Sequence, residues 1–186
     1  MRLFVAAEID DATRQQLAAA REALRSVLSE ARVPPRVTWV TPATAHVTLR
    51  FIGEASEETA AHIQAALAGL ALAPFDVTWG TIGTFGGSRN PSVIRVAPTG
   101  GLESFRRLAQ QVNERLDPVI GAGGSRPFAP HLTLARVKQR GAGVNWTRAL
   151  QAIRWTPIVA RIERVTLYQS RLSPKGPTYT ALSTHG

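Results

Sequence analysis

The sequence predicts an α+β fold rather than a doubly wound parallel sheet. Strand-like and helical stretches alternate, but many of the connections read as hairpins or returns rather than crossovers. Two strand-like stretches also carry nearly the same short motif, almost half a chain apart. This repetition predicts two lobes about a pseudo-two-fold axis, interleaved within a single domain that spans residues 1–186.

The first half of the chain supplies two clear helices between strands. Residues 2–9 are rich in strand formers, and a helix over 10–31 follows, with Asp10 or Asp11 as its N-cap. A second helix is expected over 56–71, with Ser56 or Thr59 as its cap and with acidic residues in its first turn, as the helix dipole favours. The remaining strands expected in this half are 36–41 and 45–53.

The second half is richer in strands. Residues 75–85 and 92–97 predict a hairpin, because the turn-forming sequence GGSRNP joins them. A third helix is expected over 102–116, followed by a loop over 117–130 that contains several glycines and prolines. The last elements expected are a strand over 131–137, a short helix over 145–153, and two C-terminal strands over 158–170 and 177–184.

Composition narrows the classes of function. There is no cysteine, which excludes disulfides, thiolate metal sites and a cysteine nucleophile. The net charge of +9 favours an anionic partner, of which nucleic acid is the commonest, although an arginine-rich composition alone does not require one. No stretch is apolar enough for a membrane span or a signal peptide, so we expect a cytoplasmic protein without a membrane partner. We also expect a monomer.

The repeated motif is His-x-Thr-Leu, at His46 and again at His131. In a strand, residues i and i+2 project from the same face, so each motif presents an imidazole beside the hydroxyl of Thr48 or Thr133. Two histidines that titrate near neutrality can act as a base and an acid, and the threonines can hydrogen-bond to phosphate oxygens. The other two histidines, His62 and His185, lack this context.

The repeated motif has two other interpretations, a coincidence of strand composition and a zinc site. A single His-x-Thr in a strand is commonly a coincidence, because threonine is a good strand residue, but two copies that each follow a proline favour a shared site. A zinc site is disfavoured, because two histidines without a nearby acid or cysteine supply too few ligands. We therefore expect neither a metal nor another cofactor.

The whole set of motifs resembles the two-histidine (2H) phosphoesterase superfamily, in its LigT-like branch of RNA 2′,3′-cyclic phosphodiesterases, also called 2′-5′ RNA ligases. The likeness covers nearly the whole chain: the opening RLFVAAEI, the segments WVTPATAHVTLRFIGE and RPFAPHLTLARV, and the closing SRLSPKGPTYTAL. This resemblance implies a bilobal LigT-like fold with an antiparallel sheet in each lobe, flanking helices and a basic central cleft.

The resemblance also implies a reaction and roles for residues. The expected activity is metal-independent hydrolysis of RNA 2′,3′-cyclic phosphate ends to 2′-phosphates. By this analogy His131 activates water and His46 protonates the leaving O3′, while Thr48 and Thr133 hold the phosphate. Arg136 would be a further phosphate contact and Phe51 a surface for a terminal base. Tyr168, Lys175 and Tyr179 could rim the cleft, but no spacing argument supports them.

Strand periodicity conflicts with two of these roles. Five positions separate His46 from Phe51, and His131 from Arg136, so a regular strand places each pair on opposite faces. Either the strands twist or bulge, or these side chains reach the site from its rim. Phe51 could equally be a core aromatic, and Arg136 a solvated arginine.

Three alternative functions remain open from sequence alone. The same groups could catalyse the reverse reaction, which is 2′-5′ joining of RNA ends. The substrate could be a small cyclic nucleotide, although the strong positive charge argues mildly against it. The chain could also be a non-catalytic RNA-binding module, but binding alone would not need two imidazoles.

Overall fold

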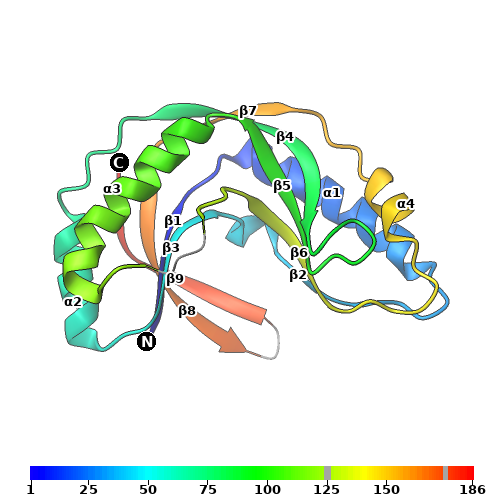
Figure 1. Ribbon diagram of the computed structural model, residues 1–186, viewed down its shortest axis with the longest axis horizontal. Helices are drawn as coiled ribbons and strands as arrows, with labels where there is room; N and C mark the ends of the chain where they lie inside the picture. The colour runs from blue at the N-terminus through cyan, green and yellow to red at the C-terminus, as the bar shows by residue number, and fades with distance from the viewer. Residues whose placement is uncertain (124–126, 174–175) are drawn as a thin grey trace.

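Two antiparallel sheets and the helices that cover them make up the computed structural model, which describes residues 1–123, 127–173 and 176–186. The first sheet has the order β3-β1-β8-β9 and the second has the order β2-β6-β5-β4-β7 (Figure 1). In chain order the elements are β1 (Arg2–Ala7), α1 (Asp11–Ser29), β2 (Arg36–Trp39), the 3₁₀ turn η1 (Pro42–Thr44), β3 (Val47–Glu54), α2 (Glu57–Leu67), β4 (Phe75–Phe85), β5 (Val93–Gly100), α3 (Leu102–Ile120), β6 (Leu132–Gln139), α4 (Trp146–Gln151), β7 (Ile158–Ile162), β8 (Val165–Ser173) and β9 (Gly176–His185).

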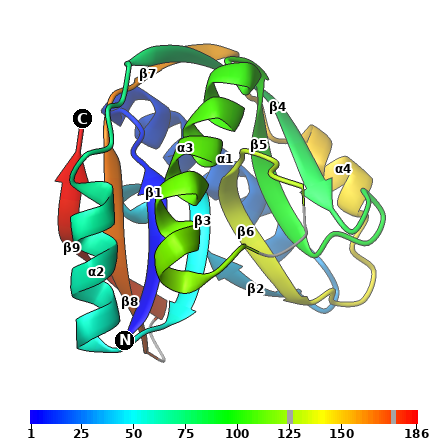
Figure 2. The same cartoon turned by 60° about the vertical axis from the view of Figure 1, so that its left-hand side comes forward.

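The predicted α+β class and the antiparallel sheets are confirmed. The first sheet takes two strands from the start of the chain and two from its end, whereas the second takes β2 and the middle strands. The chain therefore passes repeatedly between the sheets. In both views β3 of the first sheet lies next to β6 of the second (Figures 1 and 2), which brings together the two strands that carry the motifs.

Each sheet has its own helical cover. Helix α1 packs against β6, β7 and α4 of the second sheet, while α2 and α3 pack against each other and against β9 and β3 of the first. The predicted caps are present: the side chains of Asp10 and Ser56 accept hydrogen bonds from the backbone N–H groups of Thr13 and Thr59. The buried faces of the helices join the strands in one hydrophobic cluster, which includes Leu24, Trp79, Phe105 and Leu167.

Several predicted boundaries are wrong. Helix α2 ends at Leu67 and not at residue 71, since Gly69 disfavours its continuation. Helix α3 does not end at residue 116 but continues past Pro118 to Ile120, and the N–H of Gly121 closes its last turn by donating to the Asp117 carbonyl. Proline at this position does not break the helix, although it removes one backbone donor from it. The loop predicted over 117–130 is correspondingly shorter.

The stretch 158–170 forms parts of two strands in different sheets. Strand β7 pairs with β4 in the second sheet, whereas β8 pairs with β1 in the first, and the chain crosses over at Glu163 and Arg164. The adjacent charged residues Glu163 and Arg164 mark the crossing, but the same pattern also suits one continuous strand with a bulge, so the sequence does not reveal it. Within the described residues, no helix has the length and apolar character needed to cross a membrane.

Candidate active site

His46 lies between the turn η1 and strand β3, against an aromatic wall of the first sheet. Its Nδ1–H donates to the Thr44 carbonyl oxygen at 2.8 Å, which is possible only if Nδ1 carries the proton, because a carbonyl accepts and cannot donate. Its ring stacks on Phe4 at a centroid distance of 4.8 Å and meets the edge of Tyr179 at 5.4 Å. The free Nε2 is then the nitrogen available for acid–base chemistry.

His131 repeats this arrangement at the start of β6. Its Nδ1–H donates to the Ala129 carbonyl oxygen at 2.8 Å, again two residues back along the chain. Its ring packs edge-on to Phe85 at 5.0 Å. The two motifs thus fix the same tautomer by the same local hydrogen bond, and each leaves Nε2 free.

A β-bulge in β3 resolves the position of Phe51. In the pairing with β1, Thr48 lies opposite Ala6, Arg50 opposite Val5 and Phe51 opposite Phe4, so Leu49 is the extra residue. The extra residue reverses the alternation, so both Leu49 and Arg50 point into the protein and Phe51 is on the face of Thr48. Phe51 is 55% exposed, and the guanidinium of Arg2 lies 4.9 Å from its ring centre. It is not a core residue.

Strand β6 has the same bulge at the same place. In the pairing with β5, Thr133 lies opposite Arg95, Ala135 opposite Ile94 and Arg136 opposite Val93, so Leu134 is the extra residue. Leu134 and Ala135 are both buried, and Arg136 emerges exposed on the face of Thr133. The conflict between strand periodicity and both resemblance-based roles therefore disappears, because each strand bulges after its threonine.

Electrostatic interaction between the sheets connects the two motifs. Burial lowers the pKa of His46 from 6.5 to about 4; its hydrogen bond to Thr44 opposes this shift, and the charges of Arg136, His131 and Arg14 add to it. Burial also lowers the pKa of His131, with further contributions from Arg95 and Arg136. His131 and Arg136 belong to the second sheet and His46 to the first, so the structure brings the motifs within electrostatic reach of each other.

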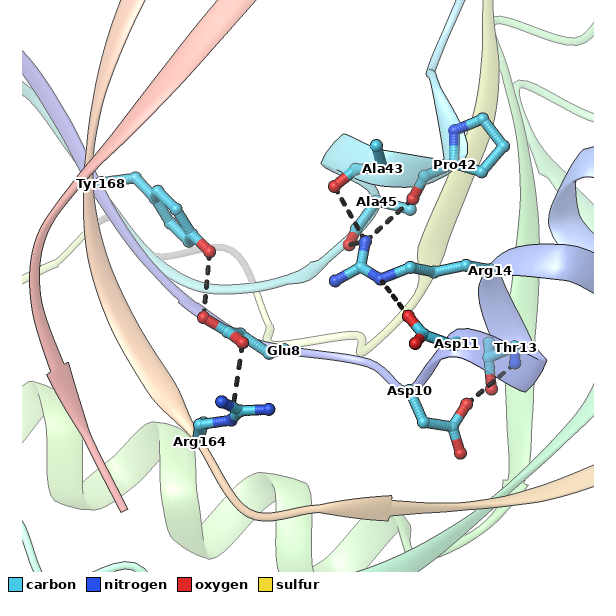
Figure 3. Close-up of polar contacts among 10 residues, drawn as sticks. All are labelled: Glu8, Asp10, Asp11, Thr13, Arg14, Pro42, Ala43, Ala45, Arg164 and Tyr168. Atoms are coloured by element: carbon cyan, nitrogen blue, oxygen red, sulfur yellow. Dashed lines mark hydrogen bonds and ion pairs between the residues drawn. The ribbon is translucent and has the colours of Figure 1, made fainter.

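Arg14 of α1 supports the turn that holds His46. Its Nη1 donates to the carbonyl oxygens of Pro42, Ala43 and Ala45 at 2.8, 2.9 and 3.2 Å. Helix α1 packs on the second sheet, so this arginine fixes the turn of one motif to the helical cover of the other (Figure 3). Arg14 is thus a structural link between the lobes, directly behind His46.

A cavity of about 100 Å³ lies beside His46. Its lining residues are Glu8, Arg14, Ala43, Thr44, Ala45, His46, Tyr168 and Tyr179. Figure 3 shows Glu8 and Tyr168 across from Arg14 and the turn, and the Tyr168 hydroxyl donates to Glu8 Oε1 at 3.1 Å. The carboxylate of Glu8 is also held by the Thr166 hydroxyl at 2.6 Å and by Arg164 at 3.7 Å.

Arg50, the residue after the first bulge, ties the first motif to the segment that leads to the second. Its guanidinium is almost buried and pairs with Asp117 at 3.0 Å, and it donates to Asn113 Oδ1 and to the Gly121 carbonyl, both at 2.8 Å. These partners lie at the C-terminal end of α3, where a cation is favourable to the helix dipole. The bulge therefore both exposes Phe51 and directs Arg50 inward.

Several residues around the two histidines carry no signal in the sequence. Phe4, Phe85 and Arg95 come from strands that contain no motif, and only strand pairing brings them to the site. Tyr168 and Tyr179, which the closing segment suggested without a spacing argument, do lie beside His46. Lys175 lies outside the described residues. Among the residues that the structure describes, no three metal-ligating side chains gather into a group.

The chain is similar to characterised families over almost its full length. A family model described as the 2′-5′ RNA ligase superfamily matches residues 11–173. A relative from Archaeoglobus fulgidus, named RNA 2′,3′-cyclic phosphodiesterase, is 33% identical over 183 residues, which cover 98% of this chain and 98% of the relative. A Thermus thermophilus relative with the same name is 32% identical over 190 residues, covering 98% of this chain and 88% of the relative.

Solved structures share the fold. TT0787 of Thermus thermophilus matches with a TM-score of 0.75 and 30% identity, over 99% of this chain and 96% of that one. E. coli LigT in its apo form matches with a TM-score of 0.72 and 25% identity, over 99% and 95% of the two chains.

Proposed function

Because the chain belongs to the 2′-5′ RNA ligase superfamily, we propose that it hydrolyses RNA 2′,3′-cyclic phosphate ends to 2′-phosphates. The observation that carries this proposal is the matched geometry of the two His-x-Thr motifs: each histidine donates its Nδ1–H to the carbonyl two residues back, and each strand bulges after its threonine. The names of the relatives, RNA 2′,3′-cyclic phosphodiesterase, support the substrate. The positive charge of +9 is suited to an RNA partner.

In the proposed reaction, His131 is the general base and His46 the general acid. Nε2 of His131 takes a proton from water, whose oxygen attacks the phosphorus. The bond from phosphorus to O3′ breaks, and Nε2 of His46 gives its proton to O3′. The product is a 2′-phosphate with a free 3′-hydroxyl, and the histidines return to their starting states by exchanging protons with solvent.

The remaining predicted residues have roles in binding. The hydroxyls of Thr48 and Thr133 donate to the nonbridging oxygens as negative charge builds on them. Arg136, on the same face as Thr133, adds a charge-assisted contact to the phosphate. Phe51 offers its exposed ring to a terminal base, with Arg2 beside it. No metal or other cofactor has a role in this scheme.

The scheme needs a protonated His46, and the charge of the bound substrate favours this form. Burial and the nearby guanidinium groups of Arg136 and Arg14 keep His46 neutral at pH 7 in the unliganded site, yet an acid must carry a proton. The anionic phosphate, once bound, opposes those positive charges and raises the pKa of both histidines. We therefore expect His46 to take up its proton together with the substrate.

The test is an assay with a short RNA that ends in a 2′,3′-cyclic phosphate, in the presence of excess chelator. The wild-type protein should release a 2′-phosphate end, and His131→Ala should lower kcat by about 10²–10⁴-fold because the general base is lost. His62→Ala is the matched control, because His62 lies exposed on α2, and it should keep full activity. Absence of a 2′-phosphate product, or an active His131→Ala variant, would contradict the proposal.

A second activity is the joining of RNA ends, which the description of the superfamily suggests. In this reaction a 5′-hydroxyl replaces water as the nucleophile: its proton goes to His131, its oxygen bonds to phosphorus, the bond from phosphorus to O3′ breaks, and His46 protonates O3′, which leaves a 2′-5′ linkage. Measuring hydrolysis and joining on the same RNA ends, at cellular concentrations of RNA, decides which reaction dominates.

A further inference from the structure

The second sheet and its helix α4 are almost free of negative charge. Their only acidic residue is Asp76, which already pairs with Arg161 at 3.2 Å. Along the chain, the segments 31–44, 77–102 and 127–162 contain ten of the 22 basic residues and none of the 13 acidic ones. The positive charge of this protein is therefore concentrated on one of its two lobes.

Three arginines of this lobe share the face that carries His131. Arg95 lies opposite Thr133 on β5, and Arg136 lies opposite Thr38 on β2. The ladder shifts between Arg36 and Val37, where Lys138 of β6 is the extra residue. Strand β2 itself has no extra residue, so Arg36, two residues before Thr38, projects from the same face of the sheet. We call Arg95, Arg136 and Arg36 the basic track. It crosses the sheet from β5 through β6 to the edge strand β2.

The basic track lacks protein partners that would neutralise it. Within the described ranges, none of its three arginines forms an ion pair, whereas Arg14, Arg50 and Arg161 all do. The Nε–H of Arg95 is buried and makes no hydrogen bond to the rest of the described chain. Beyond the track, the exposed side chains of Arg32, Lys138 and Arg140 add further positive charge near the same edge.

Arg36 is too far from the reacting phosphate to serve it. A step of two residues along a strand is about 7 Å, and Arg36 lies this far beyond Thr38, which is itself one strand away from Arg136. A mononucleotide has no second phosphate to offer it. The first sheet differs, because its face beside His46 carries the rings of Phe4, Phe51, Tyr168 and Tyr179.

We propose that the basic track binds the backbone of single-stranded RNA leading to the reacting end, so that the substrate is an oligonucleotide lying over the second sheet toward the edge of β2. This inference rests on the proposed function for the position of the reacting end. Phosphate contacts from arginine fix position without reading sequence, so the track predicts length dependence rather than base specificity.

The experiment compares a short oligoribonucleotide that ends in a 2′,3′-cyclic phosphate with a nucleoside 2′,3′-cyclic monophosphate. For Arg36→Gln, the ratio of kcat/KM for the oligonucleotide to that for the mononucleotide should fall about tenfold, as expected for the loss of one charged hydrogen bond. Arg107→Gln is the control, because Arg107 is exposed on α3 over the other sheet, and its ratio should equal that of the wild type.

A binding arm separates this inference from the proposed function. A labelled oligoribonucleotide with a 2′-phosphate end is titrated against each protein at several salt concentrations. Arg36→Gln should bind about tenfold more weakly, and the slope of log K against log salt should shrink by about 0.7, the value for one phosphate contact on a single strand. If the wild-type protein does not hydrolyse the cyclic phosphate, but Arg36→Gln still shows this weaker binding and smaller salt slope, only the proposed function is refuted.

Two results overturn the inference. One is an Arg36→Gln variant that matches the wild type in RNA affinity, salt slope and substrate ratio. The other is a wild-type protein that does not bind the RNA but binds phosphatidylserine vesicles, which would assign the basic track to a membrane surface instead.

Discussion

At the scale of single residues, the two histidines have the same backbone contact but different surroundings. Both donate from Nδ1 to a carbonyl two residues back. His46 is packed against Phe4 and Tyr179, and its pKa is lowered to about 4. Among the described residues, the ring that packs against His131 is that of Phe85. A pair of similar groups in unequal environments is a common arrangement for general acid–base catalysis.

This difference predicts how activity depends on pH. The base His131 must be neutral, so the rate falls as the pH drops through the lowered pKa of His131. The acid His46 must be protonated, so the rate falls as the pH rises through the pKa of His46. The profile of kcat/KM, which reports the free enzyme, should therefore be a bell with its optimum below pH 6.5. Bound phosphate raises both pKa values, so the optimum of kcat should lie about one unit or more higher.

The measurement is a set of Michaelis curves across pH, with the RNA substrate and constant ionic strength. Because the histidines are the groups expected to titrate in this range, a flat profile over about pH 5–9 would argue against acid–base roles for both of them.

The two threonines allow a prediction that does not depend on the order of proton transfers. Thr48→Val and Thr133→Val should each lower kcat on the order of 100-fold, because each removes a donor from the charge that develops on phosphate. Valine keeps the size and strand preference of threonine, so the fold should persist. Thr180→Val, at an exposed position of β9, is the control. Variants at Thr48 and Thr133 that stay within threefold of this control would exclude the roles proposed for them.

The place of the two motifs in the fold could be predicted, because the strand-forming residues after each histidine do form β3 and β6. Both histidines lie just before their strands rather than within them, and the roles of His46, Thr48, His131 and Thr133 stay predictions. Phe4 and Arg95 could not be predicted, because their place beside the histidines depends on which strands pair and in what register. Register is a property of the folded sheet, not of any local pattern.

At the scale of elements, the matched bulges are the feature that defines the face of the site. Without the extra residue, Phe51 would point into the protein and Arg50 would point out of it. The sequence was compatible with two arrangements: a bulged strand, or a regular strand whose last side chains reach the site from its rim. Leu49 and Arg50 are adjacent and both buried, which shows that the strand is bulged.

Helix α1 acts on the site through Arg14, and this contact can be tested with two substitutions. Arg14→Met and Arg14→Lys both disturb the three carbonyl contacts of the turn, so both should lower kcat by about 10- to 100-fold through misplacement of His46. Only Arg14→Met removes the positive charge that helps to lower the pKa of His46, so only this variant should move the pH profile upward.

The control for this pair is Arg25→Met, on the same helix, where the side chain is 54% exposed and pairs with Glu22 at 3.8 Å. It should leave both kcat and the pH profile as in the wild type. If Arg14→Lys moves the pH profile as far as Arg14→Met does, the shift does not come from loss of the positive charge, and the charge of Arg14 does not lower the pKa of His46.

At the scale of the whole molecule, the order of the strands explains why the two motifs meet. Strands β1 and β3 come from the start of the chain and β8 and β9 from its end, and the second sheet is formed mostly by what lies between. The likeness between the motifs predicted two lobes, but residues 158–170 were expected to form one strand, and they cross from one sheet to the other. Strand-forming residues lie on both sides of Glu163 and Arg164, so the local pattern could not separate a crossing from a bulge in one strand.

Interleaving predicts that the two sheets unfold together, as one domain, and the chain carries natural probes for each. All four tryptophans lie with the second sheet: Trp39 on β2, Trp79 on β4, Trp146 on α4, and Trp155, whose Nε1–H donates to the Trp79 carbonyl at 2.9 Å. Both tyrosines, Tyr168 and Tyr179, lie on β8 and β9 of the first sheet. Tryptophan fluorescence and fluorine NMR of fluorotyrosine-labelled protein therefore report on different sheets.

In urea, the two signals should change with the same midpoint and the same slope, because β1 cannot keep its partners β3 and β8 unless both ends of the chain stay in place. Four of the five strands of the second sheet lie between β3 and β8 along the chain, so unfolding of that sheet lengthens the loop that must be closed to hold the first. Separate midpoints would instead show two domains of independent stability. The contact of Arg14 with the turn at His46 would then be an interface between domains, and the Arg14→Met variant should widen the gap between the midpoints.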